Sequence, residues 1–229
     1  MGRKFYGTNG NDPIKYWIDP DNVILGRNGD EFWGRAGDDQ ITGNNANNRI
    51  YGGPGDDYLL THRGNDLIVG GPGFDIAVVR GIDLFLKSND RSYDVKVDMN
   101  LQNRWQAISA TKYNRGLKKI HSSIEGIQSG SGNDELIGNA RNNSLYSFHG
   151  DDWLFGGTGK DRLYGGEGED IFQFAKGRGH AILHDYSYDD DWLYIDVPFS
   201  RLSVDYRRKD ARIFDGNDII AYVPGFAGA

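Results

Sequence analysis

The sequence predicts an all-β protein, a solenoid of very short strands stacked coil upon coil. A nine-residue pattern, Gly-Gly-x-Gly-x-Asp-x-apolar-x, recurs along the chain and is clearest at Gly52–Leu60. The eighth position of each repeat is apolar, and helix signals are scarce. One apolar side chain between outward-facing neighbours is typical of a strand of about three residues, which cannot stand alone. Stacking successive coils would bury a continuous apolar column, so that stability becomes a sum over neighbours.

The first block of repeats lies in the N-terminal third of the chain, preceded by an isolated repeat at Gly7–Ile14. Its repeats begin at Leu25, Gly34, Gly43, Gly52, Thr61 and Gly70. Its eighth positions are Ile14, Phe32, Ile41, Ile50, Leu59, Ile68 and Ala77. We expect these side chains to point inward, while positions seven and nine point outward.

The second block repeats the first, which indicates an internal duplication. Its repeats begin at Ser129, Gly138, Ser147, Gly156 and Gly165, and its eighth positions are Leu136, Leu145, Leu154, Leu163 and Phe172. Gly43-Asn44 aligns with Gly138-Asn139, and Gly55–Asp57 aligns with Gly150–Asp152. The weaker repeats therefore fall at equivalent places in both halves.

Two stretches interrupt the period and divide the chain. We expect four segments: a first repeat block over 1–78, irregular β coils over 79–128, a second block over 129–173, and a C-terminal capping β region over 174–229. The alternating run Tyr93–Leu101 predicts a half-buried strand. In the last segment, a turn at Asp215–Asp218 predicts a hairpin between Ala211–Phe214 and Ile219–Val223, after a strand at Leu202–Tyr206.

The first six residues of each repeat must reverse the chain between two strands. Glycine at positions one, two and four permits backbone angles closed to other residues and lets carbonyl oxygens point inward. Aspartate at position six adds a carboxylate, which completes an all-oxygen ligand set suited to calcium rather than zinc. The candidate turn glycines are Gly37, Gly53, Gly55, Gly71, Gly73, Gly132, Gly150, Gly157, Gly159, Gly166 and Gly168.

The repeats resemble those of the RTX, or hemolysin-type, calcium-binding family. Ser123–Ile127 resembles the family's usual lead-in to a repeat block, and Phe172–Phe174 with Gly177–Ile182 and His184–Tyr186 resembles its usual exit, although His180 stands where an acidic residue is common. The resemblance implies a right-handed parallel β-roll that holds several Ca²⁺ ions. It also implies type I export through an uncleaved C-terminal signal, and folding only outside the cell, where calcium is abundant.

With two repeats in each coil, turns two repeats apart lie on the same side and share an ion. The predicted ligands in the first block are Asp39, Asp57 and Asp75 on one side, with Asp30, Asn48 and Asp66 on the other. Those in the second block are Asp134, Asp152 and Asp170, with Asn143 and Asp161 on the other side, and the isolated repeat contributes Asp12. The Asn48 and Asn143 turns lose a charge and lack the position-four glycine, so we expect weaker or empty sites there.

Without a cation the stacked carboxylates would lie about 4.8 Å apart. Like charges at that distance repel by roughly 1 kcal/mol even in water. Summed over several pairs, this repulsion rivals a folding free energy of about 5–15 kcal/mol. The metal-free chain is therefore expected to be largely unfolded, with calcium binding supplying the folding energy. The alternative is that aspartate at these positions merely favours turns.

Composition narrows the partners and the location. The chain of 229 residues carries a formal net charge of −7 and no basic runs, so nucleic acid is not an expected partner. It has no cysteine and no apolar stretch long enough to span a membrane. Because a repeat follows the first residues almost at once, we expect no cleavable signal peptide and a secreted protein exported by another route.

Outward aromatic residues recur at one-coil spacing. Trp33 and Tyr51 stand at position nine in the first block, Tyr146 and Tyr164 do so in the second, and Trp153 stands at position seven. Stacked aromatic rings on a flat sheet suit sugar rings or a protein partner. Alternatively, residues 79–128 and 174–229 fold back over these faces.

Three classes of function follow, led by a calcium-dependent structural or interaction module. The second is a calcium-dependent module that binds an acidic polysaccharide, like the accessory modules of alginate epimerases. Arginines near the turns would suit such a glycan: Arg35, Arg49, Arg63 and Arg162.

The third class, an enzyme, is not expected, because the chain has no His-Glu-x-x-His motif and Ser131 lacks the Gly-x-Ser-x-Gly context. His180, His184 and Asp185 form a conceivable transition-metal site, or ordinary packing and surface residues.

Overall fold

The computed structural model describes residues 4–7, 10, 13–15, 30–43, 46–62, 64–79, 94–101, 103–107, 117–174, 179–207 and 210–225. Every regular element in these ranges is a β-strand, except two 3-10 helices at Met99–Leu101 and Phe199–Arg201. The all-β prediction is thus confirmed. No described segment forms a helix with the length and apolar character that crossing a membrane requires. The chain divides into two compact units, Met1–Val97 with Leu101–Gly130, and Asp98–Asn100 with Ser131–Ala229.

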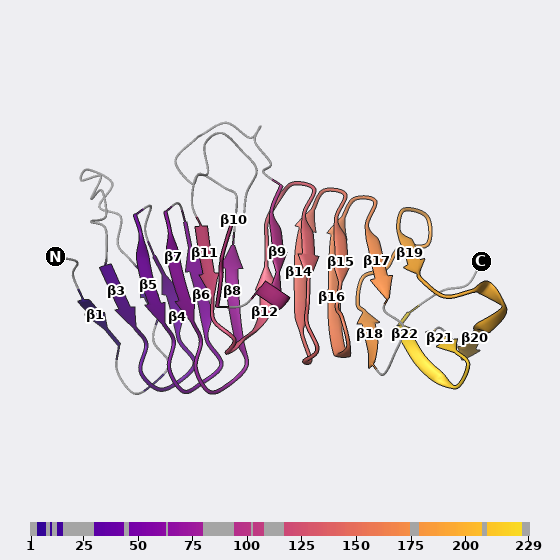
Figure 1. The fold of residues 1–229 in the computed structure, drawn as a ribbon, viewed down its shortest axis with the longest axis horizontal. Coiled ribbons are helices and arrows are strands. Elements are labelled where there is room, and N and C mark those ends of the chain that lie inside the picture. The colour runs from indigo at the N-terminus through magenta and orange to yellow at the C-terminus, as the bar shows by residue number, and fades with distance from the viewer. Residues whose placement is uncertain are drawn as a thin grey trace. The chain divides into compact units, whose positions relative to one another are not determined.

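The first unit consists of two sets of strands that alternate along the chain (Figure 1). One set, in spatial order, is β1 (Lys4–Tyr6), β3 (Asp30–Trp33), β5 (Asn48–Tyr51), β7 (Asp66–Val69), β11 (Leu117–Ile120) and β10 (Trp105–Ala107). The other is β2 (Pro13–Lys15), β4 (Gln40–Thr42), β6 (Tyr58–Thr61), β8 (Asp75–Val79) and β12 (Ile124–Gln128). The pairings are parallel except that of β10 with β11.

The second unit has the same alternation. One set is β13 (Glu135–Ile137), β15 (Trp153–Phe155), β17 (Ile171–Phe174) and β19 (Trp192–Ile195). The other is β14 (Ser144–His149), β16 (Gly159–Glu167), β18 (Gly179–Leu183), β22 (Asp218–Val223), β21 (Asp210–Asp215) and β20 (Leu202–Arg207). The last three strands pair antiparallel, which confirms the predicted hairpin and the strand before it.

The strand register shows that two repeats make one coil. Phe32 pairs with Ile50 and Ile50 with Ile68, a step of two nonapeptides each time. Ile41, Leu59 and Ala77 pair in the same way in the other set. Neighbouring strands therefore belong to successive coils, as in a parallel β-roll. The strict step ends after the second block, where Leu163 pairs with Leu183 and Phe172 with Leu193.

The eighth positions form the core, as predicted. All those whose side chains are described have no exposed surface: Phe32, Ile41, Ile50, Leu59, Ile68, Ala77, Leu136, Leu145, Leu154, Leu163 and Phe172. The side chain of Ile14 lies outside the described residues. Position-nine residues such as Leu60 are half-buried, consistent with the alternation of a pleated strand.

The stretch between the blocks returns to the same roll. Ile120 of β11 pairs with Ile68, and Ile127 of β12 pairs with Ala77, so each strand continues one set of the first unit. The alternating run before it forms a shorter strand than predicted: β9 covers only Lys96–Asp98 because the chain turns into a 3-10 helix at Met99. Val97 and Met99 are nevertheless both buried. The division into four segments stays a prediction.

Truncation of one core residue tests the inward column. Leu59→Ala should lower the free energy of unfolding in calcium by about 2–5 kcal/mol, because the coils above and below cannot fill the cavity. Leu60→Ala, next to it on the outward face, should cost less than about 1 kcal/mol because less apolar area is buried there. Urea denaturation of both variants measures the difference. Equal losses at the two positions would contradict the assigned register.

Candidate calcium sites

The predicted ligand residues stand where each turn ends and the following strand begins. The position-six side chains are at most 2% exposed: Asp30, Asp39, Asn48, Asp57, Asp66, Asp75, Asp134, Asn143, Asp152, Asp161 and Asp170. Asp12 lies outside the described residues. Buried carboxylates of this kind need compensating partners, since an uncompensated charge is expensive to remove from water.

In most of these carboxylates, one oxygen is satisfied by the neighbouring coil. The amide of Asp39 donates to Oδ1 of Asp57 at 2.9 Å, and the amide of Asp57 donates to Oδ1 of Asp75 at 3.0 Å. The second unit has the same ladder, in which Asp134 donates to Asp152 at 2.6 Å and Asp152 to Asp170 at 3.0 Å. Each aspartate thus joins its own turn to the preceding coil.

The second carboxylate oxygen has no such partner. Oδ2 of Asp57, Asp75, Asp152 and Asp170 is buried and accepts no hydrogen bond. An unsatisfied buried polar atom costs about 1–3 kcal/mol, and more when charged. These oxygens therefore mark the places where a cation would be most stabilising, and they fit a hard, oxygen-seeking ion such as Ca²⁺.

Backbone carbonyls of each turn lie close to the glycines of the next coil. All the predicted turn glycines have φ between 92° and 148°: Gly37, Gly53, Gly55, Gly71, Gly73, Gly132, Gly150, Gly157, Gly159, Gly166 and Gly168. A Cβ at Gly53 would overlap the Arg35 carbonyl oxygen, and one at Gly55 would overlap that of Gly37. Only glycine allows successive turns to stack this closely.

Burial raises the pKa of the turn carboxyls. Burial, with a smaller contribution from neighbouring carboxylates, raises the pKa of Asp57 to about 6, that of Asp75 to about 7 and that of Asp152 to about 8. For Asp161, with a pKa of about 7, burial is the only cause that raises the value. Loss of water is therefore a larger cost than the mutual repulsion on which the sequence argument relied.

A second ladder was missed from the sequence. Position-five side chains accept the position-five amide of the following coil: Asp38 accepts from Asp56 at 2.9 Å, and Asn133 accepts from Asp151 at 3.2 Å. The same bond joins Asn47 to the amide of Asn65. In this ladder the side chain accepts an amide of the following coil, whereas in the position-six ladder it accepts an amide of the preceding coil. The two ladders together therefore bond each turn to both neighbouring coils. The frequent Asp or Asn at position five was its available signal.

Two carboxylates beyond the nonapeptide frame extend the second unit's turns. Oδ1 of Asp191 accepts the amide of Asp170 at 3.1 Å, which continues the ladder by one more coil. Asp185 accepts the amides of Gly165 at 3.0 Å and Gly166 at 3.1 Å. Asp191 was not predicted from the sequence, because it follows Asp170 by 21 residues rather than by the length of two nonapeptide repeats.

The asparagine turns differ in backbone as well as charge. Neither Ala46 nor Arg141 has the positive φ of the position-four glycines. The Asn143 side chain accepts the amide of Asn139 within its own turn at 2.8 Å. The expectation of weaker or empty sites at Asn48 and Asn143 stays a prediction.

Of the two histidines, His184 is used in packing. The His184 ring stacks on Tyr164 with centroids 4.3 Å apart, and Asp185 bonds the backbone as described above. Within the described ranges, no group of three His, Cys, Asp or Glu side chains is placed to hold a metal.

The raised pKa values predict an unusual pH dependence in chelator. Protons bind the folded carboxyls more tightly than the unfolded ones, whose ordinary pKa is 3.8. The metal-free fold should therefore gain stability as the pH falls from about 8.5 to 5, and lose it again as the pH rises through those values. The strand content of the chelated chain, followed by far-UV circular dichroism from pH 8.5 to 5, measures this gain. Falling stability over that range on acidification would contradict it.

Comparison with known proteins places these repeats in a family. The model of the RTX calcium-binding nonapeptide repeat matches in four copies, at residues 25–59, 42–77, 128–163 and 150–179. No curated protein matches the chain. Among solved structures, the extracellular lipase LipA from Serratia marcescens is similar, with 17% identity and a TM-score of 0.34 over 91% of this chain. The chain spans 39% of that lipase. Both repeat blocks of the chain therefore contain RTX calcium-binding nonapeptide repeats.

Proposed function

We propose that this chain is a calcium-dependent structural or interaction module whose turns bind Ca²⁺ through carboxylate and carbonyl oxygens. The observation that carries the proposal is the buried, unpartnered Oδ2 atom repeated from coil to coil. In the turn of Asp57, the ligands would be this atom with the carbonyl oxygens of Gly53 and Gly55. The turns ending at Asp75, Asp152 and Asp170 repeat that arrangement, with the neighbouring coil completing the shell.

We further propose that calcium binding and folding are one process. Each unpartnered carboxylate oxygen costs about 1–3 kcal/mol, and several such atoms together rival a typical folding free energy of about 5–15 kcal/mol. A cation would convert each cost into a gain only in the folded chain, since the unfolded chain has no assembled site.

The proposed role is non-catalytic and extracellular. Most of the turn carboxylates already accept backbone amides of a neighbouring coil, which suits scaffolding better than proton transfer. A fold that depends on calcium is best served outside the cell, which favours secretion. Turnover of a substrate by the isolated chain would overturn the non-catalytic assignment.

A calcium titration tests the proposed coupling. Far-UV circular dichroism should report a cooperative transition from coil to strand as Ca²⁺ is added to the chelated chain. Mg²⁺ should produce no such transition at equal concentration, because it demands a smaller octahedral site and releases its water reluctantly. A chain that is fully stranded in chelator would reject the folding switch.

Two neighbouring aspartates provide a matched control for the ligands. At saturation each bound ion adds about 1.4 kcal/mol of stability for every tenfold rise in calcium. Asp152→Asn should lower this slope by about one ion, because the buried Oδ2 is replaced by an amide nitrogen. Asp151→Asn keeps the acceptor for the Glu169 amide on the exposed side and should leave the slope unchanged.

A second candidate is calcium-dependent binding of an acidic polysaccharide. In the second unit Trp153, Ile171 and Trp192 pair across β15, β17 and β19, and are 44%, 36% and 65% exposed. An exposed stripe of this kind suits the apolar faces of sugar rings. Of the predicted arginines, Arg49 forms an ion pair with Glu31 at 3.1 Å and Arg35 lies over the Tyr6 ring. Arg63 lies outside the described residues.

Affinity electrophoresis in gels containing a polyuronate distinguishes the two candidates. The glycan role predicts retardation in calcium that Trp192→Ala weakens by about fivefold, the equivalent of roughly 1 kcal/mol of stacking. Phe199→Ala, an exposed aromatic outside the stripe, is the control. If migration is unchanged by the polyuronate, the glycan role is rejected and the structural role stands.

A further inference from the structure

One turn of the first unit contains a lysine where the other turns contain aspartate or asparagine. The position-six residues of successive coils on this side are Asp30, Asn48 and Asp66, in β3, β5 and β7. The next strand is β11, and its Lys118 pairs in register with Asp66. Lys118 therefore occupies the place that position six would take in the following coil.

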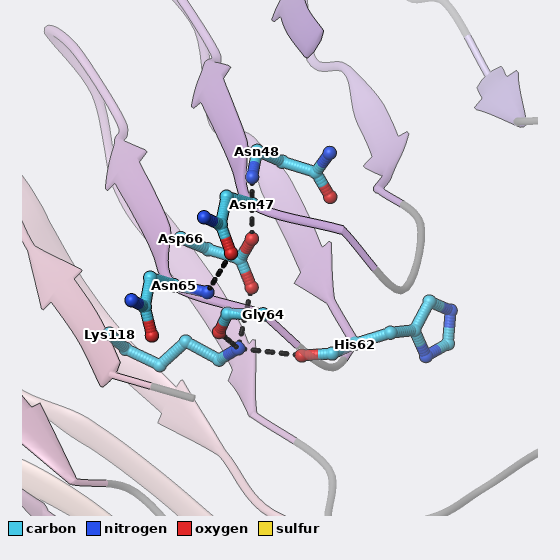
Figure 2. A network of polar contacts seen from close by, with 7 residues as sticks. All are labelled: Asn47, Asn48, His62, Gly64, Asn65, Asp66 and Lys118. Atoms are coloured by element: carbon cyan, nitrogen blue, oxygen red, sulfur yellow. Dashed lines mark hydrogen bonds and ion pairs between the residues drawn. The ribbon is translucent and has the colours of Figure 1, made fainter. Parts of the chain in front are cut away.

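The Lys118 ammonium is fully enclosed by the turn of the preceding coil. The residue is only 3% exposed, although lysine is rarely buried. Its Nζ donates to the carbonyl of His62 at 2.6 Å, the carbonyl of Gly64 at 2.9 Å and Oδ2 of Asp66 at 2.5 Å. Three acceptors match the three donors of an ammonium group (Figure 2).

These acceptors correspond to the calcium ligands proposed for the other turns. His62, Gly64 and Asp66 are positions two, four and six of one repeat, as are Gly53, Gly55 and Asp57. The difference is that Oδ2 of Asp57 is buried without a hydrogen bond, whereas Oδ2 of Asp66 is bonded to Lys118. We propose that the Lys118 ammonium takes the place of Ca²⁺ in this turn, which is then closed without metal.

The duplicated turn in the second unit supports the assignment. Asp161 stands at the equivalent repeat position and, like Asp66, accepts the amide of the preceding asparagine, here Asn143 at 2.9 Å. The residue paired with Asp161 on the next strand is Ala181, which brings no charge. The same turn thus occurs twice in the chain, once with a tethered cation and once without.

The consequence is a difference in calcium dependence between turns of one fold. The turn between β6 and β7 has its cation supplied by a side chain of the protein itself, so its closure is independent of the calcium concentration. The turns ending at Asp57, Asp75, Asp152 and Asp170 lack such a group. This inference rests on the proposed function, because it assumes that those turns bind calcium.

Calcium counting by equilibrium dialysis and native mass spectrometry tests the substitution. Lys118→Met keeps the length of the side chain but removes its charge, and should bind one more Ca²⁺ per chain than the wild type. The double variant Asp66→Asn with Lys118→Met removes the new ligand and should return to the wild-type count. Lys119→Met, on the neighbouring position of β11, should leave the count unchanged.

Variants that retain Lys118 keep the proposal falsifiable if Lys118→Met fails to fold. Asp66→Asn should bind as many ions as the wild type, whereas Asp57→Asn should bind one fewer. A loss of one ion in Asp66→Asn, or no gain in folded Lys118→Met, would overturn the inference while leaving the proposed function intact. A wild-type chain that binds no calcium would instead reject the proposed function and the inference together.

Discussion

The fold depends on the burial of one polar side chain, in most turns a carboxylate, at position six of each turn. Position six must begin a strand and pack under the next coil, so its side chain leaves water whatever its charge. A backbone amide of the neighbouring coil satisfies one oxygen, and the other requires a cation or a proton. Under the proposed function, ligand binding and chain folding would meet the same electrostatic requirement, since the site exists only when the coils are stacked.

The molecule meets this requirement in three ways. The all-aspartate turns keep a buried acceptor that suits Ca²⁺. The Asn143 turn avoids the charge and uses its side-chain oxygen within its own turn. The Asp66 turn compensates the charge with a lysine from a distant strand. The three solutions differ in how strongly the local stability should respond to calcium, so the response of the fold is set turn by turn rather than by the repeat alone.

Much of this arrangement could be predicted because the repeat is local and periodic. The apolar eighth position predicted the buried column, and the glycine offsets predicted the positive φ values of the turns. Features that break the period were not predicted from the sequence. Asp191 extends a ladder from outside the nonapeptide frame, and the position-five ladder requires knowledge of which amide faces which side chain. Neither the direction of a hydrogen bond nor an irregular step can be obtained from spacing.

The sequence alone determined the coil, its core and the chemistry of its turns, because residues nine and eighteen apart must become neighbours once such a repeat stacks. Only the tertiary structure decided which cation each turn receives. Lys118 lies 52 residues from Asp66, beyond an insertion whose length no local pattern constrains. The pairing of Ile120 with Ile68 in the core fixes the register of β11, and that register carries the ammonium into the turn.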